Sequence, residues 1–127
     1  MNPDDEADVS EEVVIMTHKL EKAQWRPFLD TVSKLLEAKE AEIEVASLDL
    51  GDQVQAEWLP LIGIAYDPND DVVEVALDGL DHMIHRPREI YLDNGVGGLT
   101  SLEIVDVDGV RQIVKLRDQL MLPAPGH

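Results

Sequence analysis

The chain has 127 residues and a formal net charge of −17, from 10 Lys and Arg against 27 Asp and Glu, and it contains no cysteine. This length suits a single domain, the charge disfavours nucleic acid and anionic lipid as partners, and the lack of cysteine excludes disulfides and thiolate metal sites. No apolar run approaches the roughly 20 residues of a membrane span, so we expect a protein that does not enter membranes. The lack of cysteine suits a reducing compartment, so we expect a cytoplasmic protein. We also expect no cofactor.

The N-terminal segment, MNPDDEADVSEE, holds six acidic residues and no basic residue. Few of its side chains are apolar, so we expect a disordered acidic tail over residues 1–12. A single domain is predicted for residues 13–118, beginning with an extended entry segment at 13–20. Residues 119–127, which include LPAPGH, are predicted to be a Pro-rich tail.

An amphipathic helix is predicted at about residues 23–38. Its apolar side chains recur three or four positions apart, at Trp25, Phe28, Leu29, Val32, Leu35 and Leu36. This spacing makes one continuous apolar face, which needs a surface to cover.

After Glu40 the pattern changes to the alternation that is typical of strands. Extended segments are predicted at residues 42–47, 54–67, 71–78 and 88–93, and on both sides of the Asp108–Gly109 turn. Such a turn between alternating segments is typical of a β-hairpin. Because no crossover helices are present, we predict an α+β fold: one N-terminal amphipathic helix packed on a five- or six-stranded antiparallel sheet or small partly open barrel.

The segment LDHMIHRPREIYLD places Asp81, His82 and His85 within five positions. On a helix the two histidines would share a face and could chelate a metal ion, whereas on a strand they would point to opposite faces. Pro87 disfavours helix just before it, although a one-turn helix at 79–85 stays an alternative. No spacing here matches a known ligand motif, so we predict no metal site and no catalytic residue, with these three as the metal candidates to examine.

Residues 67–78, DPNDDVVEVALD, resemble a calcium-binding loop in their acidic positions. That loop needs Gly at its sixth position, where this segment has Val72, and a Glu at its last position, where it has Asp78. Asp67 and Pro68 suit the start of a β-turn instead. We therefore predict a turn followed by a strand.

Charge is distributed unevenly along the chain: residues 41–85 hold eleven acidic residues and no Lys or Arg. This asymmetry favours solubility and, as a sharper hypothesis, a basic protein partner. The predicted terminal hairpin carries acidic residues on one arm and Arg111, Lys115 and Arg117 on the other. If that hairpin forms a sheet edge, two copies could pair acidic arm to basic arm, so these three residues are the interface candidates for a homodimer.

Three long segments of the chain are the main basis for a resemblance to a known family. In chain order they are LIGIAYDPNDDVVEVAL, DHMIHRPREIYLD and LTSLEIVDVDGVRQIVKL. With WRPFLDTVS and LGDQVQAEWLPL upstream, they resemble a family of small bacterial proteins known only as a domain of unknown function. The resemblance covers about residues 20–117 and implies no activity, cofactor or catalytic residue. It implies that the acidic tail lies outside the shared domain.

Taken together, these features predict a soluble, non-enzymatic domain that binds a protein partner or a copy of itself. The alternative is a small-barrel module that binds a ligand or nucleic acid, which the charge disfavours. The third hypothesis is a metal-dependent enzyme that uses Asp81, His82 and His85.

Overall fold

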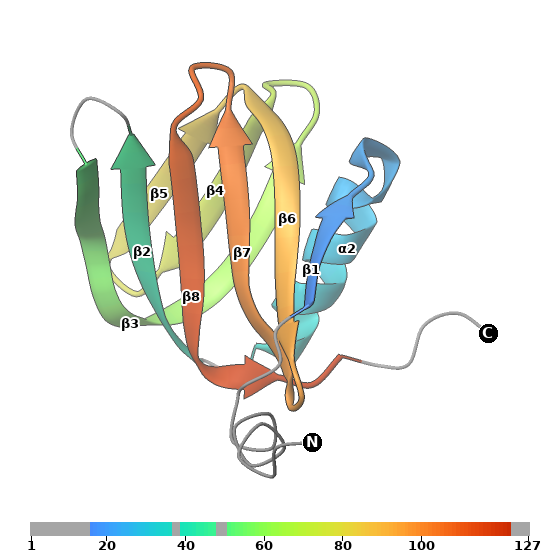
Figure 1. The fold of residues 1–127 in the computed structure, drawn as a ribbon, viewed down its shortest axis with the longest axis vertical. Coiled ribbons are helices and arrows are strands. Elements are labelled where there is room, and N and C mark those ends of the chain that lie inside the picture. The colour runs from blue at the N-terminus through green and yellow to red at the C-terminus, as the bar shows by residue number, and fades with distance from the viewer. Residues whose placement is uncertain (1–15, 37–38, 48–50, 123–127) are drawn as a thin grey trace, which may run out of the picture.

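The computed structural model describes residues 16–36, 39–47 and 51–122, so the predicted acidic tail at 1–12 lies outside the described residues. Within these ranges the chain forms one helix, α2 (Lys22–Leu35), and eight strands (Figure 1). The strands are β1 (Met16–Leu20), β2 (Glu40–Ser47), β3 (Gly51–Asp67), β4 (Val72–Leu77), β5 (Leu80–His85), β6 (Pro87–Gly95), β7 (Gly98–Asp106) and β8 (Arg111–Leu120).

All eight strands belong to one antiparallel sheet with the order β1-β6-β7-β8-β2-β3-β4-β5. The sheet curves until it forms two layers, with β1, β6, β7, β8 and β2 in the front layer and β4 and β5 behind them (Figure 1). The long strand β3 joins the layers, because its residues up to Pro60 pair with β2 and its residues from Leu61 pair with β4. The two edges of the sheet are β1 and β5.

The bend in β3 coincides with a register shift. Ala41 pairs with Leu59, but Ile43 pairs with Ala56, so β3 contains an extra residue between these pairs. Trp58 lies in this bulge with a φ of 49°, a left-handed conformation that is rare for residues other than Gly. A bulge bends and twists its strand, which explains how β3 turns from one layer into the other.

The helix α2 packs against the part of β3 that has left β2. Trp25, Leu29, Val32 and Leu36 are buried, while Phe28 is partly buried against the same core. The indole N–H of Trp25 donates to the carbonyl oxygen of Leu20 at 3.1 Å, which ties the helix to β1. The predicted helix and its apolar face are therefore confirmed, although α2 ends at Leu35 rather than at about residue 38.

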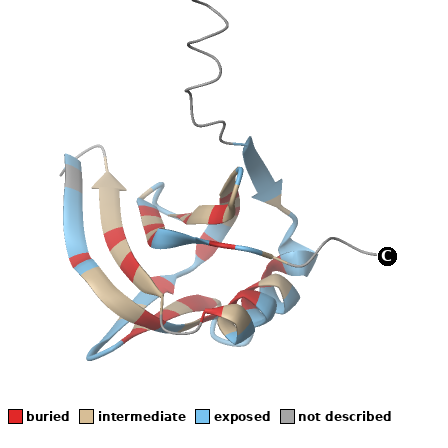
Figure 2. Cartoon of the chain, turned by 90° about the horizontal axis from the view of Figure 1, so that it is seen from below, coloured by how far each residue is buried: buried red, intermediate tan, exposed pale blue. Residues whose placement is uncertain are grey.

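Between the two layers lies a core built almost entirely from aliphatic side chains. Figure 2 shows buried residues distributed along the strands and on the helix. The fully buried large side chains are Trp25, Leu29, Leu36, Ile43, Leu61, Ile64, Leu77, Ile84, Ile90, Leu99, Leu102 and Ile104.

The predicted α+β class with five or six strands is wrong. The chain is mostly sheet, with eight strands and a single helix of 14 residues among those that the structure describes. The predicted extended entry segment at 13–20 contains β1 but was not counted as a strand of the sheet, and β5 was not predicted, because neither strand has a buried, alternating face. All of β1 except Leu20 is exposed, and Ile84 is the one buried residue of β5.

The C-terminal boundary also differs from the predicted one. Strand β8 runs to Leu120, whose side chain is buried, so the first residues of the segment predicted as a tail at 119–127 are part of the sheet. Residues 123–127 lie outside the described part of the chain. No helix within the described ranges is long and apolar enough to cross a membrane.

Candidate functional site

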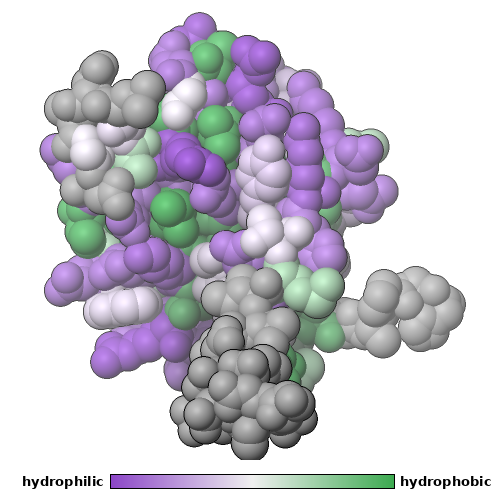
Figure 3. Space-filling view, in the orientation of Figure 1, coloured by the Kyte–Doolittle hydropathy of each residue, from purple (hydrophilic) through white to green (hydrophobic). Residues whose placement is uncertain are grey.

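The outer face of the front layer, called the front face below, carries the charged and aromatic side chains of β6, β7 and β8. Tyr91 of β6 pairs with Glu103 of β7, and Glu103 pairs in turn with Ile113 of β8. Because side chains alternate between the two faces of a strand, every second residue of these three strands joins this face. Figure 3 shows it to be mainly hydrophilic, with a few hydrophobic side chains between the polar ones.

Neighbouring hollows lie on this face, and one of them has a volume of about 460 Å³. Glu89, Tyr91, Val105 and Arg111 each line two of these hollows, so the hollows form one continuous depression. We call this depression the Tyr91 groove and define it by these four residues. It is shallow and open to solvent, and it runs across the strands rather than between the two layers.

Ion pairs fix the charged side chains of the groove. The ammonium group of Lys19 lies 3.1 Å from a carboxylate oxygen of Glu89, and Arg111 Nε donates to Glu103 at 2.9 Å. The hydrogen bond from Lys19 lowers the pKa of Glu89, and the same bond raises the pKa of Lys19. Both groups are solvent-exposed, so these pairs orient the side chains more than they stabilise the fold.

The predicted interface residues Arg111, Lys115 and Arg117 all lie on β8 and point to the front face. Arg111 pairs with Glu103 of β7, so this ion pair joins the two arms of the terminal hairpin. Lys115 and Arg117 instead pair with carboxylates of β2, at 2.6 Å to Glu44 and 2.7 Å to Glu40. Strand β8 lies between β7 and β2, so the expectation that the terminal hairpin forms a sheet edge is wrong.

The predicted metal candidates lie on β5 and do not converge. His82 points inward, where its Nε2 is hydrogen-bonded to the side-chain oxygen of Gln112 on β8. Asp81 and His85 are exposed, and their positions on the strand turn them to the opposite face. Among the residues that the structure describes, no group of three or more His, Asp or Glu side chains is arranged to hold a metal ion.

The segment with calcium-loop spacing is a turn followed by a strand. Residues 68–71 form the turn, and β4 starts at Val72. The side chain of Asp67 accepts a hydrogen bond from the backbone N–H of Asn69 at 2.9 Å. This bond is the local contact by which Asp favours a turn, so Asp67 has a structural role here.

Sequence reasoning did not single out Glu89, Tyr91 or Val105. The strand pattern of residues 88–93 was recognisable, and it places residues 89, 91 and 93 on one face. What makes a groove is the order β6-β7-β8, which brings Tyr91 and Arg111 together across β7. An exposed Tyr on an otherwise acidic strand face was the available signal.

Comparison with known proteins gives relatives without an assigned activity. Residues 16–125 match a "Family of unknown function (DUF5335)". An "Uncharacterized protein" of the bacterium Aquifex aeolicus (strain VF5) is 41% identical over 108 residues, which cover 84% of this chain and 97% of that protein. No solved structure matches.

Proposed function

We propose that this chain, which belongs to the family of unknown function DUF5335, is a non-enzymatic protein-binding domain whose binding site is the Tyr91 groove. The observation that carries the proposal is the meeting of the front-face hollows at Tyr91 and Arg111. The resemblance drawn from the sequence is confirmed at the level of the family, which names no activity.

The residue types in the groove support a protein partner. Tyr and Arg are enriched where alanine substitutions most weaken protein–protein binding, because each offers a large contact area together with directional hydrogen bonds. In this groove the ion pair with Glu103 already orders the guanidinium group of Arg111, which lowers the entropy lost on binding. Small-molecule sites are typically enclosed and mostly apolar, whereas this depression is open to solvent and mixes charged side chains with small and apolar ones.

The alternatives from the sequence receive less support. A nucleic-acid site needs basic groups that are free to replace counterions, and Lys19, Arg111 and Arg117 each pair with a carboxylate on the front face. A metal-dependent enzyme needs converging ligands, whereas His82 and His85 lie on opposite faces of β5. Binding in the cytoplasm agrees with the lack of cysteine.

Self-association through the front face is the second candidate, and a specific observation favours it. Acidic and basic side chains occupy the same face, so two copies related by a two-fold axis could match Arg111 with the carboxylates of the partner. Sedimentation at tens of micromolar protein and physiological salt would reveal this dimer. A dimer that disappears on Arg111→Glu supports this interface, and a clean monomer contradicts it.

Site-specific crosslinking tests the proposed groove. A photoreactive phenylalanine analogue replaces Tyr91, and the same analogue at Ile62, which is 63% exposed and lies outside the groove, is the matched control. We expect one protein to be crosslinked from position 91 and not from position 62, with a lower yield when Arg111→Ala is added. Equal crosslinking from both positions, or crosslinking to RNA, would contradict the proposal.

A further inference from the structure

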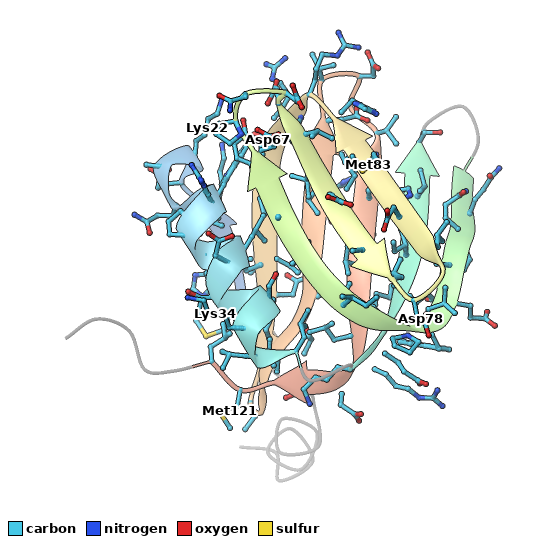
Figure 4. All side chains as sticks on the ribbon, turned by 180° about the vertical axis from the view of Figure 1, so that it is seen from behind. Lys22, Lys34, Asp67, Asp78, Met83 and Met121 are labelled. Carbon is cyan, nitrogen blue, oxygen red and sulfur yellow. The ribbon has the colours of Figure 1, made fainter. Side chains whose placement is uncertain are left out.

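The free edge of β5 lies in the back layer, away from the Tyr91 groove. Strand β5 is the last strand of the sheet and pairs with β4 alone. Figure 4 shows the back layer from behind, with α2 beside β3 and with Met83 on β5, the strand of this layer farthest from the helix. Among the strands that the structure describes, none lies beside the other side of the β5 backbone.

The register shows which backbone groups face the open side. Val72 pairs with His85, and one position further along the backbone N–H of Arg86 donates to the carbonyl oxygen of Asp71. In an antiparallel ladder alternate residues direct their N–H and C=O groups toward the partner strand, so Arg86 and every second residue before it face β4. The N–H and C=O groups of Asp81, Met83 and His85 therefore point to the open side.

The exposed side chains of β5 leave this edge accessible. Met83 is 42% exposed and Leu80 is 38% exposed, while Asp81 and His85 are also at the surface. Natural sheets protect their edges with Lys, Pro or bulges. The other edge strand, β1, follows this rule with Lys19, whereas β5 contains neither Lys nor Pro.

The residues of β3, β4 and β5 carry a negative net charge. Residues 51–85, which include β3, β4 and β5, hold eight acidic residues and no Lys or Arg. All the ion pairs in the described part of the chain join residues outside 51–85. Glu74 lies directly beside Met83 in the ladder, and Asp81 belongs to β5 itself. This negative field attracts a basic segment and repels a second copy of the same edge.

We infer that the open edge of β5 binds an extended basic segment of another protein, which adds to the sheet as a ninth strand. Backbone hydrogen bonds to Asp81, Met83 and His85 supply affinity, and Lys or Arg side chains at alternate positions pair with Asp81 and Glu74. Apolar side chains between them lie on the other face of the added strand, the face of Leu80 and Ile84. This binding surface is separate from the Tyr91 groove and does not depend on it.

The test uses the full chain and a fluorescein-labelled peptide of nine residues in which Lys and Val alternate. The matched peptide has Glu in place of Lys. Fluorescence anisotropy measures affinity at about 50 mM and about 300 mM salt, because an electrostatic contribution weakens as the Debye length shortens. Hydrogen exchange by NMR follows the backbone amides of Asp81, Met83 and His85. We expect the Lys peptide to bind and to slow exchange at these three amides, and the Glu peptide not to bind.

Two variants place the contact on β5. Met83→Lys and Asp81→Lys each add positive charge at the edge, so each should weaken binding of the Lys peptide by about tenfold or more through like-charge repulsion. Two variants are used so that a folding defect in one does not decide the result. Met121→Lys is the matched control, because Met121 is 70% exposed and lies far from β5 (Figure 4), and it should keep the affinity within about twofold.

Several outcomes would overturn the inference. Binding without amide protection would mean attraction to the acidic surface rather than strand addition. Equal weakening by Met121→Lys would mean that net charge alone decides affinity. A dimer that Met83→Lys disrupts would make the edge an interface between two copies of this chain. Loss of peptide binding on Tyr91→Ala would assign the peptide to the front face.

Discussion

The hydroxyl group of Ser33 in α2 makes two hydrogen bonds to the backbone of Ile64 in β3: it donates to the carbonyl oxygen at 2.7 Å and accepts from the N–H at 2.9 Å. Ile64 also pairs with Val75 of β4, on the other side of β3. A helix side chain thus takes the place of a strand where β3 has separated from β2. This contact explains how the backbone groups of β3 find partners on the side where β2 no longer pairs with it.

Replacing Ser33 by Ala should lower the free energy of unfolding by about 1–3 kcal/mol, because both backbone groups of Ile64 would lose their partner in a partly buried place. Urea denaturation measures the change. Thr31→Ala is the matched control, since its hydroxyl donates to the carbonyl oxygen of Pro27 at the exposed surface of the same helix. A loss as small as that of the control would show that water or another group replaces Ser33.

Differences in burial along the apolar face of α2 predict which alanine substitution lowers the stability more. Leu29 is fully buried, so Leu29→Ala should cost about 2–5 kcal/mol of stability through lost burial and the cavity left behind. Phe28 is partly buried, so Phe28→Ala should cost less than the change at Leu29 although its side chain is larger. Denaturation midpoints of the two variants decide this, and the reverse order would mean that the helix packs with a different face inward.

The helix and most strands were predictable because each carries a local signal. The face of Trp25, Leu29 and Val32 repeats at helical spacing within one segment. In β8, Val114 and Leu116 are buried while Lys115 and Arg117 lie on the front face, which is the alternation of a half-buried strand. When one face of a helix or strand is buried, apolar residues recur in the sequence at the spacing of that face, so the pattern can be read from the sequence.

The pairing of distant strands was not predictable in the same way. The contact of β8 with β2 joins Lys115 to Glu42, and no local pattern reports which strand lies beside another. The expectation of a hairpin at the sheet edge failed for this reason. The Tyr91 groove was missed for the same reason, because it exists only after β6, β7 and β8 are placed side by side.

Deleting residues 1–12 should leave the melting temperature unchanged. The family match and the described strand β1 both start at residue 16. The deleted residues include six acids and few apolar groups, so they cannot offset an ordering cost of about 1–2 kcal/mol per residue for the backbone. Differential scanning calorimetry of the shortened chain tests this, and a large fall in the melting temperature would contradict it.

Tyr66 should make the fold sensitive to alkaline pH. Its hydroxyl group donates to a carboxylate oxygen of Asp71 at 2.8 Å, and its side chain is buried. Burial, with a further contribution from this hydrogen bond, raises the pKa of Tyr66 from 10.0 to about 12. The phenol therefore keeps its proton in the folded chain at pH values where the unfolded chain has lost it.

Because the folded pKa of Tyr66 is the higher one, its contribution to stability is fully present below about pH 10 and is lost as the pH rises toward about 12. The free energy of unfolding, measured by urea denaturation across this range, should fall with pH. Tyr66→Phe should be less stable at neutral pH, because the bond to Asp71 is lost, but should show a shallower alkaline decline. Tyr91→Phe, at the front-face tyrosine, is the matched control and should keep the full decline. An unchanged alkaline decline in Tyr66→Phe would mean that other groups cause it.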